Sequence, residues 1–169
     1  MRRQIEIHSL EMTAPDDFRP SPFPPGFEVR QARIPSPELN RFFYVTVGVD
    51  WHWTDRLVWT LDDWLAYLDR PELETWIGYV EGTPAGYFEL ERQPERQVEL
   101  KYFGLLPRFV GRGLGGALLT AAVERGWEMG AFRIWLHTNT LDSPMALKNY
   151  EARGFRVFKV ERLERDLAG

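Results

Sequence analysis

The sequence predicts a mixed α/β (α+β) fold in a single domain, and three observations lead to this prediction. Its 169 residues are close to the usual length of one domain. The part before residue 97 contains two strand-like segments joined by a tight turn, which must run antiparallel. The part after residue 97 alternates strand, helix, strand, helix and strand, an order typical of folds that combine helices with a sheet.

The first 26 residues contain an alternating segment followed by a proline-rich segment. Alternation of apolar residues over 4–13 predicts a short edge strand with an irregularity in its middle. Five prolines over 15–25 exclude a helix or a central strand, so we expect a coil that crosses the surface. A second alternating strand is predicted over 27–34.

Two helices are predicted next, each from the residues at its ends. Ser36 can cap the first helix and Pro37 suits its first turn, so this helix begins there and ends at Gly48. The second helix covers 61–68 and stops before Pro71, because proline removes a backbone donor.

A hairpin follows the helices. Residues 75–82 and 85–92 predict two antiparallel strands, joined by a tight turn over 81–84. The alternating segment 97–105 adds a third strand to this group.

The last third of the chain alternates helices and strands. Apolar spacing predicts a largely buried helix over 113–129 and a strand over 133–138. A short helix over 143–152 has proline in its first turn, and a final strand covers 154–163.

Composition and charge exclude several classes of function. The net charge of -4 gives no electrostatic reason to bind nucleic acid or an anionic membrane. Cysteine is absent, which excludes a disulfide framework and a thiolate nucleophile and fits a cytoplasmic protein. We expect neither a secretory leader nor a membrane-spanning segment. The three histidines lack metal-ligand spacing, so no metal site is predicted.

A glycine-rich loop over 111–116 separates a predicted strand from the long predicted helix. Its four glycines allow backbone N–H groups to converge at a helix N-terminus, where the helix dipole favours anions such as phosphate. The same glycines could instead form a tight turn that packs the helix closely against the sheet.

Spacing separates the ligands that such a loop could bind. A P-loop needs Lys-Ser or Lys-Thr after its last glycine, but Ala117 and Leu118 follow here. A dinucleotide-binding loop follows its strand directly, whereas five residues intervene here, and too few residues remain for its parallel sheet. Binding of acyl-coenzyme A is the third interpretation of this loop, and the spacing does not exclude it.

Two linked segments, LLPRFVGRGLGGALL over 105–119 and SPMALKNYEARGF over 143–155, resemble the motifs of the GNAT superfamily of N-acetyltransferases. The resemblance implies a mainly antiparallel central sheet with a V-shaped splay between two parallel strands and helices on both faces. It also implies an acceptor-side half over 27–96 and an acetyl-CoA-binding half over 97–169.

The same resemblance implies that acetyl-CoA is the acetyl donor. Its pantetheine arm is expected along the strand that carries Phe103 and Leu105. Its diphosphate is expected on the backbone amides of Val110, Gly111, Arg112, Gly113, Leu114, Gly115 and Gly116.

The chain departs from the family pattern at two positions. Val110 stands where Arg or Gln is usual, so charge is expected from Arg112 or Arg108 instead. Ser143 stands where Asn is usual, and the polar contact of that Asn is expected from Ser143, Asn139 or Asn149.

Acetyl transfer to an amine needs a base for the amine and an acid for the departing thiolate. The resemblance assigns Glu99 as the base and Tyr150 as the acid. Glu89 on the neighbouring strand, His52 or a chain of water molecules is an alternative base. Structural roles also stay open, because Glu99 can pair with Lys101 and Tyr150 can belong to the core.

The acceptor is expected at the aromatic segment in and after the first helix. Aromatic faces beside Asp50 or Asp55 suit a cationic or aromatic amine, although the same residues could simply close one end of the core. His137, at the end of a strand, is interpreted as a structural histidine. The predicted acceptor-contacting residues are Tyr44, Trp51, His52, Trp53 and Arg56.

Together these features predict an acetyl-CoA-dependent N-acetyltransferase that acts on a primary amine of a small molecule or peptide. Direct transfer in a ternary complex is expected because no cysteine can form an acyl-enzyme. A non-catalytic acyl-CoA-binding or regulatory module of the same fold is the alternative. Two copies are expected to pair, if at all, through the N-terminal or the final strand.

Overall fold

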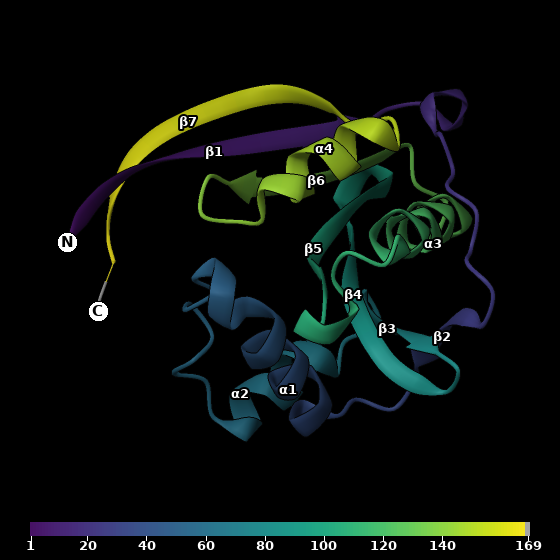
Figure 1. Cartoon of the computed structure of the whole chain (residues 1–169), viewed down its shortest axis with the longest axis horizontal. Coiled ribbons are helices and arrows are strands. Elements are labelled where there is room, and N and C mark those ends of the chain that lie inside the picture. The colour runs from purple at the N-terminus through teal and green to yellow at the C-terminus, as the bar shows by residue number, and fades with distance from the viewer. Residues whose placement is uncertain (168–169) are drawn as a thin grey trace.

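The computed structural model describes residues 1–167 and contains one seven-stranded sheet (Figure 1). The strand order is β2-β3-β4-β5-β6-β1-β7, and every neighbouring pair is antiparallel except β5 and β6. The predicted mainly antiparallel sheet is therefore confirmed. The strands are β1 (Arg2–Met12), β2 (Phe27–Ala32), β3 (Leu73–Val80), β4 (Thr83–Gln93), β5 (Gln97–Leu105), β6 (Arg133–Asn139) and β7 (Arg156–Asp166).

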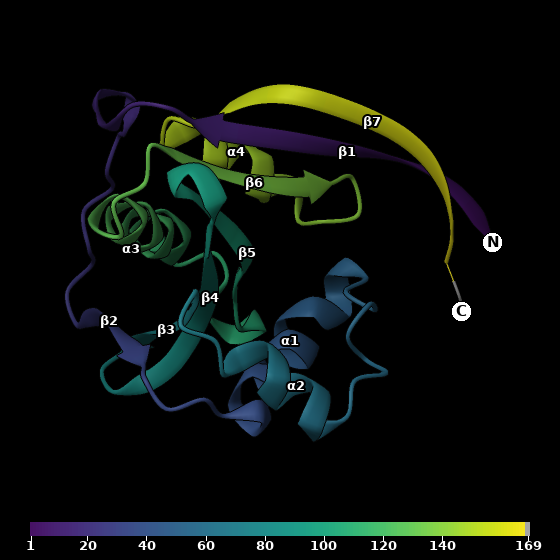
Figure 2. The same ribbon diagram turned by 180° about the vertical axis from the view of Figure 1, so that it is seen from behind.

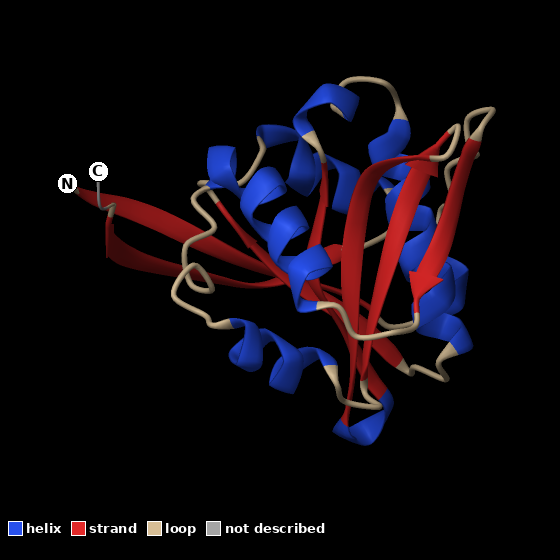
Figure 3. Cartoon of the chain, turned by 90° about the horizontal axis from the view of Figure 1, so that it is seen from below, coloured by secondary structure: helices blue, strands red, loops and turns tan. Residues whose placement is uncertain are grey.

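Four α-helices cover the sheet, with α3 on one face and α1 and α2 on the other (Figures 1 and 3). The predicted starts of the first and the last helix are confirmed, because Ser36 Oγ accepts from the backbone of α1 and Ser143 Oγ accepts from the backbone of α4. The helices are α1 (Pro37–Gly48), α2 (Leu61–Leu68), α3 (Leu114–Glu128) and α4 (Pro144–Ala152). None of the helices within residues 1–167 is both long and apolar enough to cross a membrane.

Alternation along β3 and β4 divides the core between the two faces. Trp76 lies opposite Phe88, and both pack in the cluster that includes α3. Ile77 lies opposite Tyr87, and both pack with Phe43 of α1. Successive side chains of a strand point to opposite faces, so one hairpin supports helices on both.

The parallel strands β5 and β6 pair over only a short length. Three neighbouring pairs of residues form the ladder, after which the two strands separate. This confirms the V-shaped splay, and it leaves the backbone of both strands available along a gap. The paired residues are Gln97 with Arg133, Val98 with Ile134, and Glu99 with Trp135.

The N-terminal strand does not lie at the edge of the sheet, and that prediction was wrong. β1 is inserted between β6 and β7, and it pairs with both. Apolar alternation shows which face of a strand is buried but carries no information about which strands lie beside it. Beyond β6, β1 and β7 continue as a two-stranded arm that projects from the body (Figure 2).

The proline-rich segment crosses the surface as predicted. It contains a short 3-10 turn at Pro15–Asp17 and then runs past the end of α4 to α3. Arg19 N donates to Arg153 O at 2.9 Å, and Ser21 N donates to Thr120 Oγ1 at 2.8 Å. These bonds satisfy backbone donors that a coil would otherwise leave unpaired.

Candidate active site

The segment between β5 and α3 turns sharply at two glycines. Gly111 and Gly113 have φ of +82° and +76°, a left-handed conformation that favours glycine. Within residues 1–167, no atom outside each glycine and its two chain neighbours lies within 4 Å of where a Cβ would stand. Gly113 precedes the first turn of α3, and no side chain caps this end of the helix. The first N–H groups of a 15-residue helix are therefore left for an external acceptor.

A cavity of about 700 Å³ opens beside this turn, between the separated ends of β5 and β6. Arg112 does not line it, because its guanidinium lies against the ring of Phe109, 5.2 Å from the centroid. The cavity brings together the other residues predicted to hold the acyl donor: Phe103, Leu105, Val110, Gly111, Gly113, Leu114, Gly115, Gly116, Asn139, Ser143 and Asn149.

Arg153, at the end of α4, brings positive charge to the cavity. Its Nη1 lies 2.6 Å from where a Cβ of residue 116 would stand, so Gly116 lets the guanidinium pack against the first turn of α3. Its Nε is buried and has no hydrogen-bond partner among the described residues. An unpartnered guanidinium N–H beside a helix N-terminus suits a phosphate.

Glu99 lies on β5 at the last pair before the strands separate. Its Oε1 accepts from Gln93 Nε2 at 3.0 Å, while its buried Oε2 has no hydrogen-bond partner. Oε2 lies 3.5 Å from Lys101 Nζ and 3.9 Å from His137 Nδ1. Lys101 and His137 line the cavity and Glu99 does not, so the carboxylate can act there only through a neighbouring group.

Tyr150 of α4 is 7 % exposed and lines the cavity. Its ring lies edge-on to Phe103 of β5, with the centroids 6.0 Å apart. Burial, with a smaller effect of the Asp142 carboxylate, raises the pKa of Tyr150 above its ordinary value. The phenol therefore keeps its proton at neutral pH. A group that is to donate a proton in this cavity must be protonated.

The three polar residues expected near the pantetheine arm also shape the cavity wall. Asn139 Oδ1 accepts from Leu141 N at 2.8 Å and so stabilises the loop before α4. Ser143 caps α4, and Asn149 Nδ2 donates to Gly115 O at 3.0 Å. The last bond joins α4 to the first turn of α3, which keeps the two sides of the cavity together.

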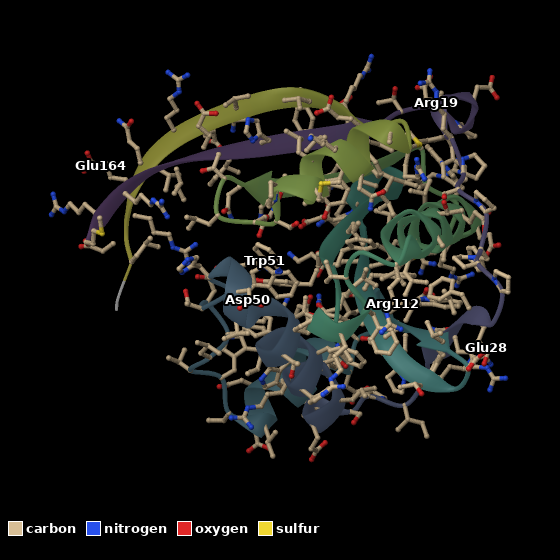
Figure 4. The ribbon with its side chains drawn as sticks, viewed as in Figure 1. Arg19, Glu28, Asp50, Trp51, Arg112 and Glu164 are labelled. Carbon is tan, nitrogen blue, oxygen red and sulfur yellow. The ribbon has the colours of Figure 1, made fainter. Side chains whose placement is uncertain are left out.

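The segment after α1 forms another wall of the cavity, and Figure 4 shows Asp50 and Trp51 on it. Trp53 Nε1 donates to Asp142 Oδ1 at 3.3 Å, which links this wall to the loop before α4. Three of the predicted acceptor residues line the cavity: Trp51, His52 and Trp53.

A family model described as the acetyltransferase (GNAT) family matches residues 34–155. The chain belongs to the GNAT acetyltransferase family. This confirms the resemblance that the glycine loop and the segment around Tyr150 suggested, because both lie within the matched range.

Related proteins support the same family. An uncharacterised N-acetyltransferase of Mycobacterium tuberculosis is 32 % identical over 91 residues, which are 54 % of this chain and 58 % of that protein. The mycothiol acetyltransferase of Corynebacterium aurimucosum is 42 % identical over 59 residues, 35 % of this chain and 19 % of that enzyme. The chain therefore matches less than two thirds of the length of either relative.

Solved GNAT structures share the fold at low sequence identity. A GCN5-related N-acetyltransferase from Sphaerobacter thermophilus has a TM-score of 0.72 at 16 % identity, over 95 % of this chain and 50 % of that one. An aminoglycoside acetyltransferase from an uncultured soil sample has a TM-score of 0.63 at 11 % identity, over 76 % of this chain and 87 % of that one.

In this GNAT chain, Glu89 and Arg56 form a buried ion pair away from the cavity. Arg56 Nη1 donates to Glu89 Oε1 at 3.1 Å, and the two side chains are 6 % and 0 % exposed. Tyr67 and Asn40 also donate to the carboxylate, at 2.7 and 3.0 Å. Tyr44 accepts from the backbone of Arg56, and neither Tyr44 nor Arg56 lines the cavity.

Sequence reasoning missed Arg153, Arg165 and the proximity of His137 to Glu99. Arg165 of β7 donates to Asp55 at 2.9 Å, and both line the cavity. His137 carried a signal, because it lies near the end of β6, the strand that borders the splay. No signal in the sequence pointed to Arg165, because the two-stranded arm of β1 and β7 that brings it to the cavity forms only in the tertiary structure.

In residues 1–167 no three His, Asp or Glu side chains gather as metal ligands.

Proposed function

We propose that this chain is an acetyl-CoA-dependent N-acetyltransferase that transfers an acetyl group to a primary amine by direct attack in a ternary complex. Family membership supports acyl transfer in general. One observation carries the finer proposal: a single cavity is lined by an uncapped helix N-terminus, the phenol of Tyr150 and the imidazole of His137. Phosphate binding, acid catalysis and base catalysis thus have candidates within reach of one bound donor.

The glycine loop fits the diphosphate of coenzyme A. Open space at Gly111 and Gly113 lets an anion approach the backbone closely, and α3 offers its first N–H groups. The unpartnered Nε of Arg153 adds a charged donor at the same end of the helix. We assign the diphosphate to these groups, and the pantetheine arm to the gap lined by Phe103 and Leu136.

Acetyl-CoA, when bound, supplies a thioester carbonyl that is activated toward an amine. We assign His137 as the group that takes the amine proton, since its ring lines the cavity and its Nδ1 faces the carboxylate of Glu99. Glu99, whose Oε2 lies 3.9 Å from that nitrogen, orients the ring. Tyr150 gives a proton to the departing sulfur.

The experiment is acceptor-dependent release of free thiol from acetyl-CoA, measured with a panel of primary amines on small molecules and peptides. We expect release only when an amine is present, together with an acetylated product by mass spectrometry. The non-catalytic alternative predicts that acetyl-CoA binds but that no amine increases thiol release. Failure of the folded protein to bind acetyl-CoA at all would exclude both functions.

A further inference from the structure

The proline-rich segment between β1 and β2 passes along α3 and reaches the cavity (Figure 2). Ser21 of this segment lines the cavity, close to the glycine loop. It lies outside residues 34–155, the range that the family model matches. The segment therefore brings to the cavity a polar side chain that does not belong to the matched family domain.

The backbone of Ser21 is fixed against α3. Ser21 N donates to Thr120 Oγ1 at 2.8 Å, and the Thr120 hydroxyl donates in turn to Gly116 O at 2.7 Å. Thr120 is 2 % exposed, so water competes little for these bonds. Pro20 and Pro22 restrict the backbone on both sides of Ser21. A ligand that contacts this residue therefore has little chain motion to suppress.

The side chain of Ser21 meets that of Arg153 at the first turn of α3. Ser21 Oγ lies 3.0 Å, and Arg153 Nη1 2.6 Å, from the point where a Cβ of residue 116 would stand. Gly116 thus leaves room for both polar groups beside the helix N-terminus. The buried Nε of Arg153 has no hydrogen-bond partner within residues 1–167. A hydroxyl, a guanidinium and a helix N-terminus together suit a phosphate group.

We propose that Ser21 is a donor-binding residue, whose hydroxyl donates to a phosphate oxygen of coenzyme A beside the guanidinium of Arg153. This role rests on the proposed function, because it requires the diphosphate at the N-terminus of α3. A serine hydroxyl can donate one hydrogen bond without adding charge. The segment between β1 and β2 then forms one wall of the donor site, in addition to connecting the two strands.

The test is the dissociation constant Kd of coenzyme A, measured by isothermal titration calorimetry on the full chain. Ser21→Ala removes a hydrogen bond to a charged group and is expected to raise Kd about tenfold. Ser21→Asp and Ser21→Asn are a matched pair, because their side chains have nearly the same shape and differ in charge. The aspartate would lie beside a phosphate, so its Kd should exceed that of Ser21→Asn about a hundredfold at low salt and less at high salt.

Hydrogen exchange of the Ser21 amide is a second measurement that does not depend on activity. Coenzyme A should slow this exchange in wild type, because it ties the side chain of Ser21 to the donor, and should slow it less in Ser21→Ala. The control variant is Thr13→Ala, which changes the same N-terminal region at a residue outside the cavity lining. Its Kd should equal that of wild type. Circular dichroism checks that every variant is folded.

Three results would overturn the role of Ser21 and leave the proposed function intact. These are a folded Ser21→Ala that binds coenzyme A as tightly as wild type, equal Kd values for Ser21→Asp and Ser21→Asn, and a Ser21 amide whose exchange coenzyme A does not change. If wild type itself does not bind coenzyme A, the proposed function fails and the role of Ser21 fails with it.

Discussion

The buried Oε2 of Glu99 lies 3.9 Å from Nδ1 of His137, across the line where β5 and β6 separate. The two residues are far apart in the sequence and meet only because the strands are neighbours up to that point. The carboxylate is hidden from the cavity while the imidazole lines it. In the proposed mechanism, His137 contacts the amine and Glu99 orients His137.

Replacing His137 is expected to lower turnover strongly. His137→Gln removes the group that takes the amine proton, and a loss of about 10²- to 10⁴-fold in kcat is typical of a general base. Glu99→Gln should reduce kcat less, because it removes only the group that orients the ring.

The control for this pair is His52→Gln, since His52 lines the same cavity. Nearly normal turnover is expected for it. If His52→Gln lowers kcat strongly and His137→Gln does not, then His52 is the base.

A side chain at Gly113 is expected to abolish donor binding. Gly113→Asp adds a carboxylate at the N-terminus of α3, where it repels a diphosphate and occupies the cradle. Thermal stabilisation by acetyl-CoA measures the effect. The matched control is Gly82→Asp in the β3–β4 turn, because Gly82 has a similar φ of +80° and also has open space around it. Both variants should be destabilised alike, and only Gly82→Asp should still respond to acetyl-CoA.

Removing the phenol of Tyr150 is expected to slow turnover without weakening donor binding. Burial raises the pKa of Tyr150, so the group stays protonated through the usual assay range and can donate throughout it. Tyr150→Phe should therefore lower kcat by about 10²-fold at every neutral or mildly alkaline pH, the size typical of a lost general acid. Tyr87→Phe is the control, because that buried hydroxyl has no partner and lies outside the cavity lining. Equal turnover of wild type and Tyr150→Phe would remove Tyr150 from the mechanism.

Breaking the buried ion pair of Glu89 is expected to destabilise the fold. Burial has the largest single effect and opposes the charge of Arg56, but the carboxylate of Glu89 together with Tyr67 and Tyr102 outweighs it and raises the pKa of Arg56. Arg56→Met leaves that carboxylate unpaired and should cost about 3–5 kcal/mol of unfolding free energy. The double variant with Glu89→Gln should cost less than the sum of the single variants.

Urea denaturation measures these values. The control is Arg30→Met, an exposed ion-pair partner whose loss should change stability by less than about 1 kcal/mol. If the Arg56→Met change is as small as the control, the pair contributes little to folding.

Much of the fold follows from local patterns. The hairpin of β3 and β4, the cap at Ser36, the short helix that begins with Pro144 and the long helix after the glycines all lie where alternation, spacing and end signals predict them. These features depend on neighbours within a few residues, which is the range that a sequence pattern describes. The loop of the candidate site is predictable for the same reason, since its motif is continuous.

The sequence by itself determined the class of the fold, the glycine loop and the placing of Tyr150 beside it. Only the tertiary structure decided that β1 lies inside the sheet, that Arg153 and not Arg112 lines the cavity, and that Glu99 faces His137. Each of these depends on which distant segments pack side by side. The free energy of the whole chain decides which distant segments pack together, so a short stretch of sequence does not determine this packing.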